Sequence, residues 1–143
     1  MEVHYNIELH CNISDGADSV TTSEGRVIHP ELGSADAGRN GPSPETLLMA
    51  AISTSYSITL SSVLREAGLP RSRVSVRADG VTVGSHGRPK FTRVRVSPTI
   101  RGADVLRRGA YEKAATVARD DCPIGCSIRG NVAYIVGDVV LLR

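Results

Sequence analysis

Two cysteines, Cys122 and Cys126, stand four residues apart around a turn that begins at Pro123. If the turn is helical, this spacing places both sulfurs on one face. The pair could form a reducible disulfide, contact a soft metal, or be two small buried apolar residues. A cysteine at the start of a helical turn gains thiolate character, whereas Asp120 and Asp121 oppose ionisation by like-charge repulsion. None of the four His is spaced to complete a metal site, so we expect no metal and no cofactor.

A second group of candidate residues lies on a predicted helix with Ser43 as N-cap and Pro44 as its first residue. Glu45 falls in the first turn, where the helix dipole favours an acid by about 0.3–1 kcal/mol; it could also orient a cation or act as a general base. Ser55 lies ten residues later and could hydrogen-bond a ligand or the Ala51 carbonyl. As a nucleophile it would need a base, yet no His is near in sequence and no Gly-x-Ser-x-Gly turn is present.

This helix is expected to run to about Ala67, because Gly68 and Pro70 follow. Residues 46–64 contain no charge in 19 positions, which could be mistaken for a membrane span. Eight of the 19 are Ser or Thr, a hydroxyl content that is costly in lipid. We therefore expect a helix buried inside protein.

The composition of the chain limits its partners. Its 143 residues fit a single domain over 1–143, and a formal charge of +2 is too balanced to argue for nucleic acid or an acidic membrane surface. An aromatic content of 3% is poor for base stacking. Three cysteines, including Cys11 on the apolar face of a predicted strand, and no visible export signal indicate a cytoplasmic protein with reduced thiols.

The remaining elements predict an α+β fold in the order β-β-β-α-β-β-α-β. Residues 3–13 alternate apolar and polar, as in a half-buried strand. Shorter strands are expected at 19–22 and 26–29, then a surface loop at 30–42. After the long helix we expect a strand hairpin at 74–83 and 90–100, a helix over 103–119, and a final β-rich stretch at 131–142, bent at Gly137-Asp138.

Three stretches of this chain resemble the Ohr/OsmC family of thiol-dependent organic hydroperoxide reductases, with the closer likeness to the Ohr branch. The resemblance covers nearly the whole chain and implies an intertwined homodimer. In such a dimer, long central helices are wrapped by sheets from both chains, and two pockets lie at the subunit interface. The stretches are Pro30-Glu31-Leu32-Gly33 leading to Gly41-Pro42-Ser43-Pro44-Glu45, the long helix itself, and Cys122-Pro123-Ile124-Gly125 followed by Arg129-Gly130-Asn131-Val132.

The resemblance also assigns roles to individual residues. Ser55 matches the family's peroxide-attacking cysteine, Cys122 matches the resolving cysteine, and Glu45 matches the glutamate that holds an arginine. The position of that arginine matches Ser14, although Arg39 or another loop arginine could reach the site. A serine cannot replace the thiolate in peroxide reduction, because that step needs a soft nucleophile that ionises near neutral pH.

Three function hypotheses follow. In the first, a diverged member keeps an interface pocket for an apolar small molecule, with Glu45, Ser55 and Cys122 serving binding or acid–base chemistry; Ile52 and Tyr56 are further candidates to line it. The second is a hydroperoxide reductase of oxidative-stress defence, either seen as a Cys→Ser mutant or using Cys122 and Cys126 with a dithiol reductant. The third is a non-catalytic binding protein. We expect no nucleic-acid or membrane partner.

Overall fold

The computed structural model describes residues 10–12, 19–21, 27–28, 44–84 and 89–143, and the chain divides into two compact units, 1–48 and 49–143. The first unit contains β1 (His10–Asn12), β2 (Ser19–Thr21) and β3 (Val27–Ile28) in one antiparallel sheet. Cys11 pairs with Val20 in this sheet. These strands confirm the expected ones at the residues described. The rest of the strand predicted over 3–13 and the loop predicted over 30–42 lie outside the described residues.

The long helix α1 spans Pro44–Glu66, as the sequence predicts. It ends where expected, because Gly68 adopts a left-handed φ of 63° that favours glycine. The Leu69 amide then donates back to the Leu64 carbonyl and closes the helix end. The predicted N-cap, Ser43, lies outside the described residues.

The predicted hairpin is confirmed as the antiparallel pair β4 (Arg73–Val83) and β5 (Lys90–Arg101), with a bulge between Val81 and Thr82. The final stretch forms two strands, β6 (Ala133–Val136) and β7 (Val140–Leu142), interrupted at Gly137-Asp138. Both run parallel to β5 and pair with it, β6 along residues 93–96 and β7 along 99–101. β5 is therefore the central strand, with β4 on its other edge.

The predicted second helix begins with a 3₁₀ turn, η1 (Val105–Arg107), which precedes α2 (Arg108–Asp121). The turn expected after Cys122 is helical and forms α3 (Pro123–Ile128). Asp104 caps the 3₁₀ turn by accepting a hydrogen bond from the Leu106 amide, so the predicted start near Ala103 was about five residues early for the α-helix. Cys122 separates α2 from α3 with an extended backbone, since the following Pro123 disfavours a helical conformation.

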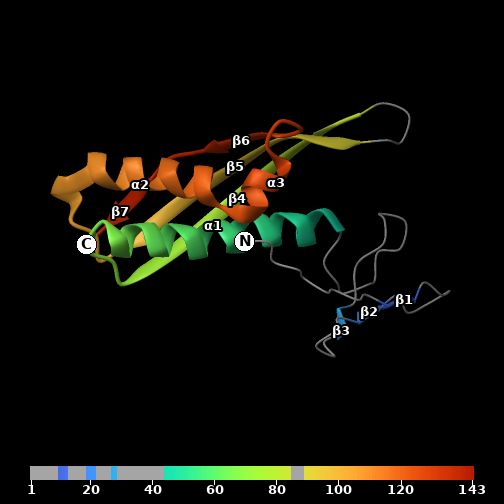
Figure 1. The fold of residues 1–143 in the computed structure, drawn as a ribbon, viewed down its shortest axis with the longest axis horizontal. Coiled ribbons are helices and arrows are strands. Elements are labelled where there is room, and N and C mark those ends of the chain that lie inside the picture. The colour runs from blue at the N-terminus through green and yellow to red at the C-terminus, as the bar shows by residue number, and fades with distance from the viewer. Residues whose placement is uncertain (1–9, 13–18, 22–26, 29–43, 85–88) are drawn as a thin grey trace, which may run out of the picture. The chain divides into compact units, whose positions relative to one another are not determined.

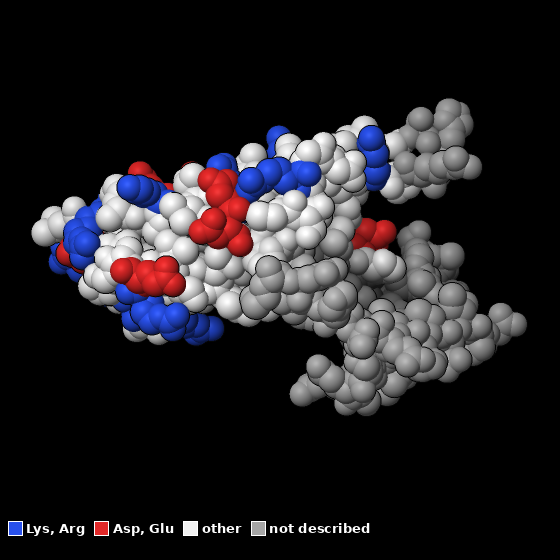
Figure 2. Space-filling model, in the orientation of Figure 1, with Lys and Arg blue, Asp and Glu red and all other residues white. Residues whose placement is uncertain are grey.

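The core of the second unit lies between these helices and one face of the sheet (Figure 1). Val94, Val96 and Ile100 alternate along β5 and point into it, as expected for a strand with one buried face. α1 and α2 contribute the opposite side of the core. On the face drawn in Figure 2, positive and negative side chains are interspersed, in keeping with the small net charge.

Candidate functional site

A shallow groove runs along α1 and reaches the first residue of α3. It encloses about 550 Å³. Ser55 lies on its wall, and none of the described lining residues is charged. An uncharged, mainly aliphatic lining suits an apolar ligand, with hydroxyl groups available to orient it. The residues that line it are Ala50, Ala51, Thr54, Ser55, Ile58, Thr59 and Pro123.

The position of Ser55 follows from the pattern of α1. The helix buries a stripe with four-residue spacing, consisting of Ile52, Tyr56, Leu60 and Leu64. Ser55 precedes Tyr56 by one residue, so the rotation of the helix places Ser55 at the border of that stripe. Its side chain is half-buried there. It can therefore face both the groove and the protein interior.

Ser55 and Cys122 meet at this border. The Cys122 thiol donates a hydrogen bond to Ser55 Oγ at 3.1 Å. Cys122 is fully buried, and its backbone amide donates to the Ala118 carbonyl at 2.9 Å, which holds it at the end of α2. The family resemblance expects an attacking sulfur at one of these two positions and a resolving sulfur at the other. In this chain the hydroxyl oxygen of Ser55 takes the first place and contacts the sulfur of Cys122.

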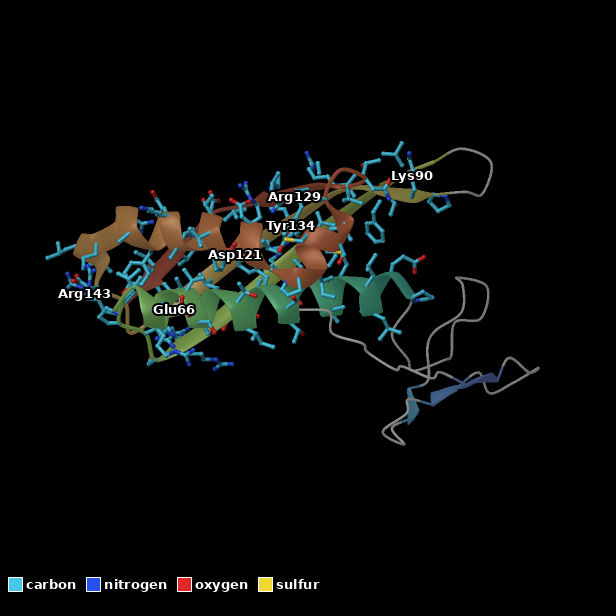
Figure 3. The ribbon with its side chains drawn as sticks, viewed as in Figure 1. Glu66, Lys90, Asp121, Arg129, Tyr134 and Arg143 are labelled. Carbon is cyan, nitrogen blue, oxygen red and sulfur yellow. The ribbon has the colours of Figure 1, made fainter. Side chains whose placement is uncertain are left out.

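Tyr134, from β6, lies next to α3 (Figure 3). A Cβ added at Gly125 would collide with its ring, so only glycine at this position lets the ring pack against the helix. The Tyr134 hydroxyl is buried and makes no hydrogen bond in the described part of the chain. Burial raises the pKa of Tyr134 well above its usual value of 10.0, and the neighbouring Cys122 sulfur raises it further.

Ile52 and Tyr56, the other two residues predicted to line the pocket, lie in the core with no exposed surface, and neither is on the groove wall. Tyr56 is tied into the interior, because its hydroxyl donates to the Ala115 carbonyl at 2.9 Å. Burial, then the Cys122 sulfur, raises the pKa of Tyr56 above its usual 10.0. Tyr56 thus joins α1 to α2 behind Ser55.

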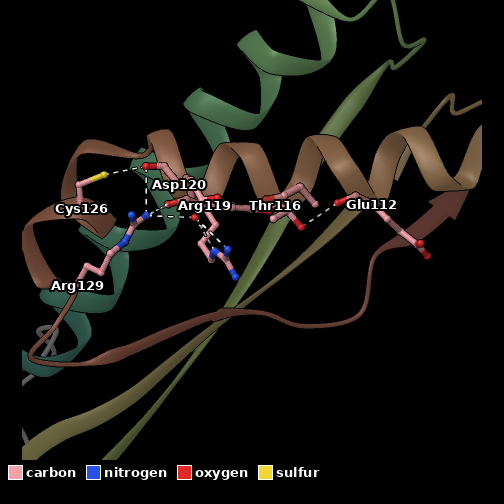
Figure 4. Close-up of polar contacts among 8 residues, drawn as sticks. Glu112, Thr116, Arg119, Asp120, Cys126 and Arg129 are labelled. Carbon is pink, nitrogen blue, oxygen red and sulfur yellow. Dashed lines mark hydrogen bonds and ion pairs between the residues drawn. The ribbon is translucent and has the colours of Figure 1, made fainter.

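Cys126 has different surroundings from Cys122. It is exposed, and its thiol donates to the Asp120 carbonyl at 2.9 Å (Figure 4). Arg129 donates to the same carbonyl and to the Asp120 carboxylate, each at 3.2 Å, and Arg119 also pairs with that carboxylate. Both cysteines are free thiols: one faces α1 in the interior and the other faces the end of α2 at the surface.

Three other predicted site residues are not placed relative to the groove by the described structure. Glu45 is exposed in the first turn of α1, within the first compact unit. Ser14 and Arg39 lie outside the described residues. Within the residues that are described, no group of three or more His, Cys, Asp or Glu could hold a metal ion.

A larger cavity of about 730 Å³ lies on the sheet, away from the predicted site. Charged side chains of β4 and β5 line it, including Arg77, Asp79 and Arg95, and none of the predicted site residues takes part. Arg77 and Asp79 already pair with each other at 3.1 Å. We assign the candidate site to the α1 groove, because Ser55 lies on its wall and accepts a hydrogen bond from Cys122.

Sequence reasoning missed two kinds of site residue. Ala51, Ile58 and Thr59 lie three or four positions from Ser55 and share its side of the helix, so a helical projection would have found them. Tyr134 gave no such signal, because its contact with Gly125 depends on how β6 packs against α3. Gly125, which makes room for it, was part of the recognised Cys-Pro turn.

Comparisons with known proteins agree with this architecture. A model of the OsmC-like protein family matches residues 35–136. The uncharacterized protein YmaD of Bacillus subtilis is 25% identical over 104 residues, which cover 68% of this chain and 67% of YmaD.

Solved structures extend the likeness to the fold as a whole. An OsmC-like protein from Mycoplasma pneumoniae superposes with a TM-score of 0.83 at 13% identity, covering 100% of both chains. An organic hydroperoxide resistance protein OsmC from Legionella pneumophila gives 0.77 at 18% identity, covering 97% of this chain and 99% of its own. The organic hydroperoxide resistance protein OhrB of Bacillus subtilis gives 0.68 at 18% identity, covering 96% and 98%.

The strand and helix order, the separate antiparallel and mixed sheets, and the match over residues 35–136 lead to one assignment. The α+β fold expected from the sequence is confirmed as OsmC/Ohr-like, and this chain belongs to the OsmC-like protein family.

Proposed function

We propose that this protein is a diverged OsmC/Ohr-like protein whose groove beside Ser55 binds an apolar small molecule, and that it is not a standard cysteine peroxidase. Membership of the OsmC-like family and the likeness to hydroperoxide resistance proteins point broadly to redox or hydroperoxide-related function. The finer assignment depends on the residues of the groove.

The contact between Ser55 and Cys122 carries this proposal. The resemblance pairs two sulfurs at these positions, and the first of them must attack the peroxide oxygen. Here the hydroxyl of Ser55 occupies that place, 3.1 Å from the remaining sulfur. A hydroxyl remains protonated near neutral pH and is a hard, weak nucleophile towards peroxide, so the usual first step is lost.

The groove supports an apolar ligand. Its described lining contains aliphatic side chains, three hydroxyl groups and no charge, with Ile58 65% exposed. Filling it would remove apolar surface from water at roughly 25 cal/mol per Å². The hydroxyls of Thr54, Ser55 and Thr59 would orient a ligand that carries a single polar group.

A homodimer is part of the same proposal. α1 is long and apolar enough to cross a membrane by length and composition, and only 22% of its most apolar window is buried. One such helix is weak evidence for a membrane span, because a core helix passes the same test. A second copy of the chain would cover this surface through a two-fold contact and place the groove at the interface. We place this soluble dimer in the cytoplasm.

The direct test is reduction of an organic hydroperoxide with dithiothreitol or a dihydrolipoyl system as electron donor. We expect no robust turnover by the protein, and robust turnover would overturn the proposal. The turnover of the Ser55→Cys variant distinguishes two explanations, divergence of the whole site and loss of the attacking thiol alone. No gain in this variant supports divergence of the whole site, whereas a large gain identifies an inactivated reductase.

A second candidate function follows from the retained Cys122 thiol next to the groove. In this alternative Cys122 attacks the hydroperoxide, releasing the alcohol and leaving a sulfenic acid. An external dithiol then reduces the sulfenic acid, releases water and becomes a disulfide. Cys126 is less suited to resolve it within the chain, because its thiol faces the Asp120 carbonyl at the surface. Cys122→Ser should then abolish turnover, and Cys126→Ser is the matched control.

The third hypothesis, binding without catalysis, stays a prediction. Mass spectrometry of any ligand that co-purifies with the protein tests this hypothesis. The same measurement tests whether the groove binds a ligand. Thr54→Trp would fill the groove from an exposed position without entering the core. Ligand retained by this variant would place the binding site elsewhere.

A further inference from the structure

The cavity on the sheet lies on the face opposite the core, and the backbone of β5 explains why it forms there. Pro98 stands in the middle of β5 and has no amide hydrogen to donate. The amide and carbonyl of a strand residue point to the same edge, and the edge alternates along the strand. The Val96 carbonyl accepts from the Gly137 amide at 2.8 Å, so Pro98 lacks its donor on that same edge. This gap in the ladder coincides with the break between β6 and β7, which forms one wall of the cavity.

Two of the charged side chains around this cavity neutralise each other, and two others are available. Arg77 donates to the Asp79 carboxylate at 3.1 Å. Arg95 lies directly opposite Asp79 on the neighbouring strand, yet it forms no ion pair with a described residue. Asp138, in the break between β6 and β7, forms none with the described residues either. The cavity therefore offers one guanidinium and one carboxylate, which come from different elements and do not pair with each other.

The side chain of Arg95 has a defined course along the wall of the cavity. A Cβ built on Gly137 would lie 2.9 Å from Arg95 Cδ and would also collide with Ser97 Oγ, so glycine at this position permits the close approach. Ser97 and Thr99 follow Arg95 at alternate positions of β5 and also line the cavity. Neither hydroxyl has a hydrogen-bond partner among the described residues. One edge of the cavity thus carries a row of three available donors.

We propose that this cavity binds a small zwitterion, an α-amino acid with an aliphatic side chain. The ligand carboxylate accepts hydrogen bonds from the Arg95 guanidinium and from the hydroxyls of Ser97 and Thr99. The ligand ammonium pairs with the Asp138 carboxylate on the facing wall. An anion without an ammonium group would leave Asp138 unpaired beside it, and a cation without a carboxylate would face Arg95. The available charges of the cavity therefore match a ligand that carries both.

The apolar part of the lining defines the ligand's side chain. Ile135 pairs with Arg95 in the β5–β6 register, and Val140 pairs with Thr99 in the β5–β7 register, so an apolar side chain lies beside each of these donors. Val140 is 43% exposed and gains cover from an aliphatic ligand. A volume of about 730 Å³ is within the usual range of small-molecule sites. This site shares no described lining residue with the α1 groove, so it goes beyond the proposed function.

The test is a titration of the isotope-labelled protein with L-leucine, followed by NMR amide shifts, which give both the affinity and the location. We expect saturable shifts at residues 95–99 and 135–140, with a Kd of about 1 mM for a ligand of this size. Two analogues separate the charges: isocaproate lacks the ammonium group of leucine, and isoamylamine lacks its carboxylate. Both should bind more weakly than leucine.

Two substitutions assign each charge of the ligand to one wall. Arg95→Gln should weaken leucine and isocaproate by about threefold to fivefold and leave isoamylamine unchanged. Asp138→Asn should weaken leucine and isoamylamine to a similar extent and leave isocaproate unchanged. Both side chains are exposed, so neither substitution should unfold the protein. Arg93→Gln is the matched control, because Arg93 is exposed on the same face of β5 without lining the cavity.

Several outcomes would overturn this inference. The absence of saturable shifts at the cavity would do so, as would shifts confined to residues 50–59 of the α1 groove. Isocaproate that binds as tightly as leucine and ignores Asp138→Asn would make the cavity an anion site instead. An Arg93→Gln effect equal to that of Arg95→Gln would reduce the binding to general attraction by a basic surface. Failure of the α1 groove to bind an apolar ligand would count against the proposed function and leave this titration unaffected.

Discussion

The Cys122 thiol donates a hydrogen bond to the hydroxyl of Ser55, 67 residues away in sequence, across 3.1 Å. One partner lies at the border of the buried stripe of α1, and the other in the extended break between α2 and α3. This contact links the two segments that carry the candidate chemistry.

The contact predicts that Ser55→Cys forms a disulfide with Cys122 under mild oxidation. The two side chains already face each other, and a disulfide needs its sulfurs about 2.05 Å apart, which a small rotation could provide. In a Cys11→Ser/Cys126→Ser background, intact mass should fall by two hydrogen atoms and recover with reductant. Thr54→Cys in the same background is the control, since its side chain is exposed one position along the helix. A disulfide in the control but not in Ser55→Cys would contradict the geometry.

The packing of Tyr134 against α3 predicts that Gly125→Ala is destabilising. The added methyl group would collide with the tyrosine ring, and overpacking of a core contact costs about 1–3 kcal/mol. Urea unfolding measures the loss. Gly109→Ala, in α2, meets no atom within 4 Å and should instead stabilise by about 0.5–1 kcal/mol, the helix-propensity difference. Equal effects of the two substitutions would show that the Tyr134 contact is not tight.

The exposed side of α1 predicts that Ile58→Asp weakens self-association. Ile58 is 65% exposed, so the substitution should change monomer stability by no more than about 0.5 kcal/mol. Burying the new carboxylate against a second α1 would be costly. Light scattering should give twice 15.2 kDa for the parent protein and 15.2 kDa for the variant. Leu106→Asp, at a residue 89% exposed on η1, is the control that should remain a dimer.

The buried tyrosines predict loss of stability in alkali. The pKa values of Tyr56 and Tyr134 lie above their usual 10.0 in the folded state, so above about pH 10 the unfolded chain binds fewer protons than the folded one. Their contribution is complete below pH 10 and falls as pH rises, by about 1.4 kcal/mol per pH unit for each tyrosine. Urea unfolding between about pH 9 and about pH 11 checks the slope. The Tyr56→Phe/Tyr134→Phe protein should show a flatter curve, and an equally steep one would assign the loss to other groups.

Much of the scaffold was predictable because its signals are local. The stop of α1 at Gly68, the β4–β5 hairpin and the interruption of the last strand pair at Gly137-Asp138 follow from turn residues and periodicity. The start of α2 was predicted too early, because Asp104 caps a 3₁₀ turn that has the composition of a helix. The fold prediction is confirmed, whereas the roles of Glu45, Ser14 and Arg39 stay predictions.

By itself the sequence determined the family, the α+β order of elements, and the serine where the resemblance expects a thiol. Those features follow from short motifs and from the spacing of apolar residues within single segments. Only the tertiary structure decided that Ser55 touches Cys122, that Cys126 faces a different surface, and that the Tyr134 ring packs against Gly125. These relationships join α1, α2, α3 and β6, and they depend on side-chain packing between elements, which one-dimensional periodicity does not encode.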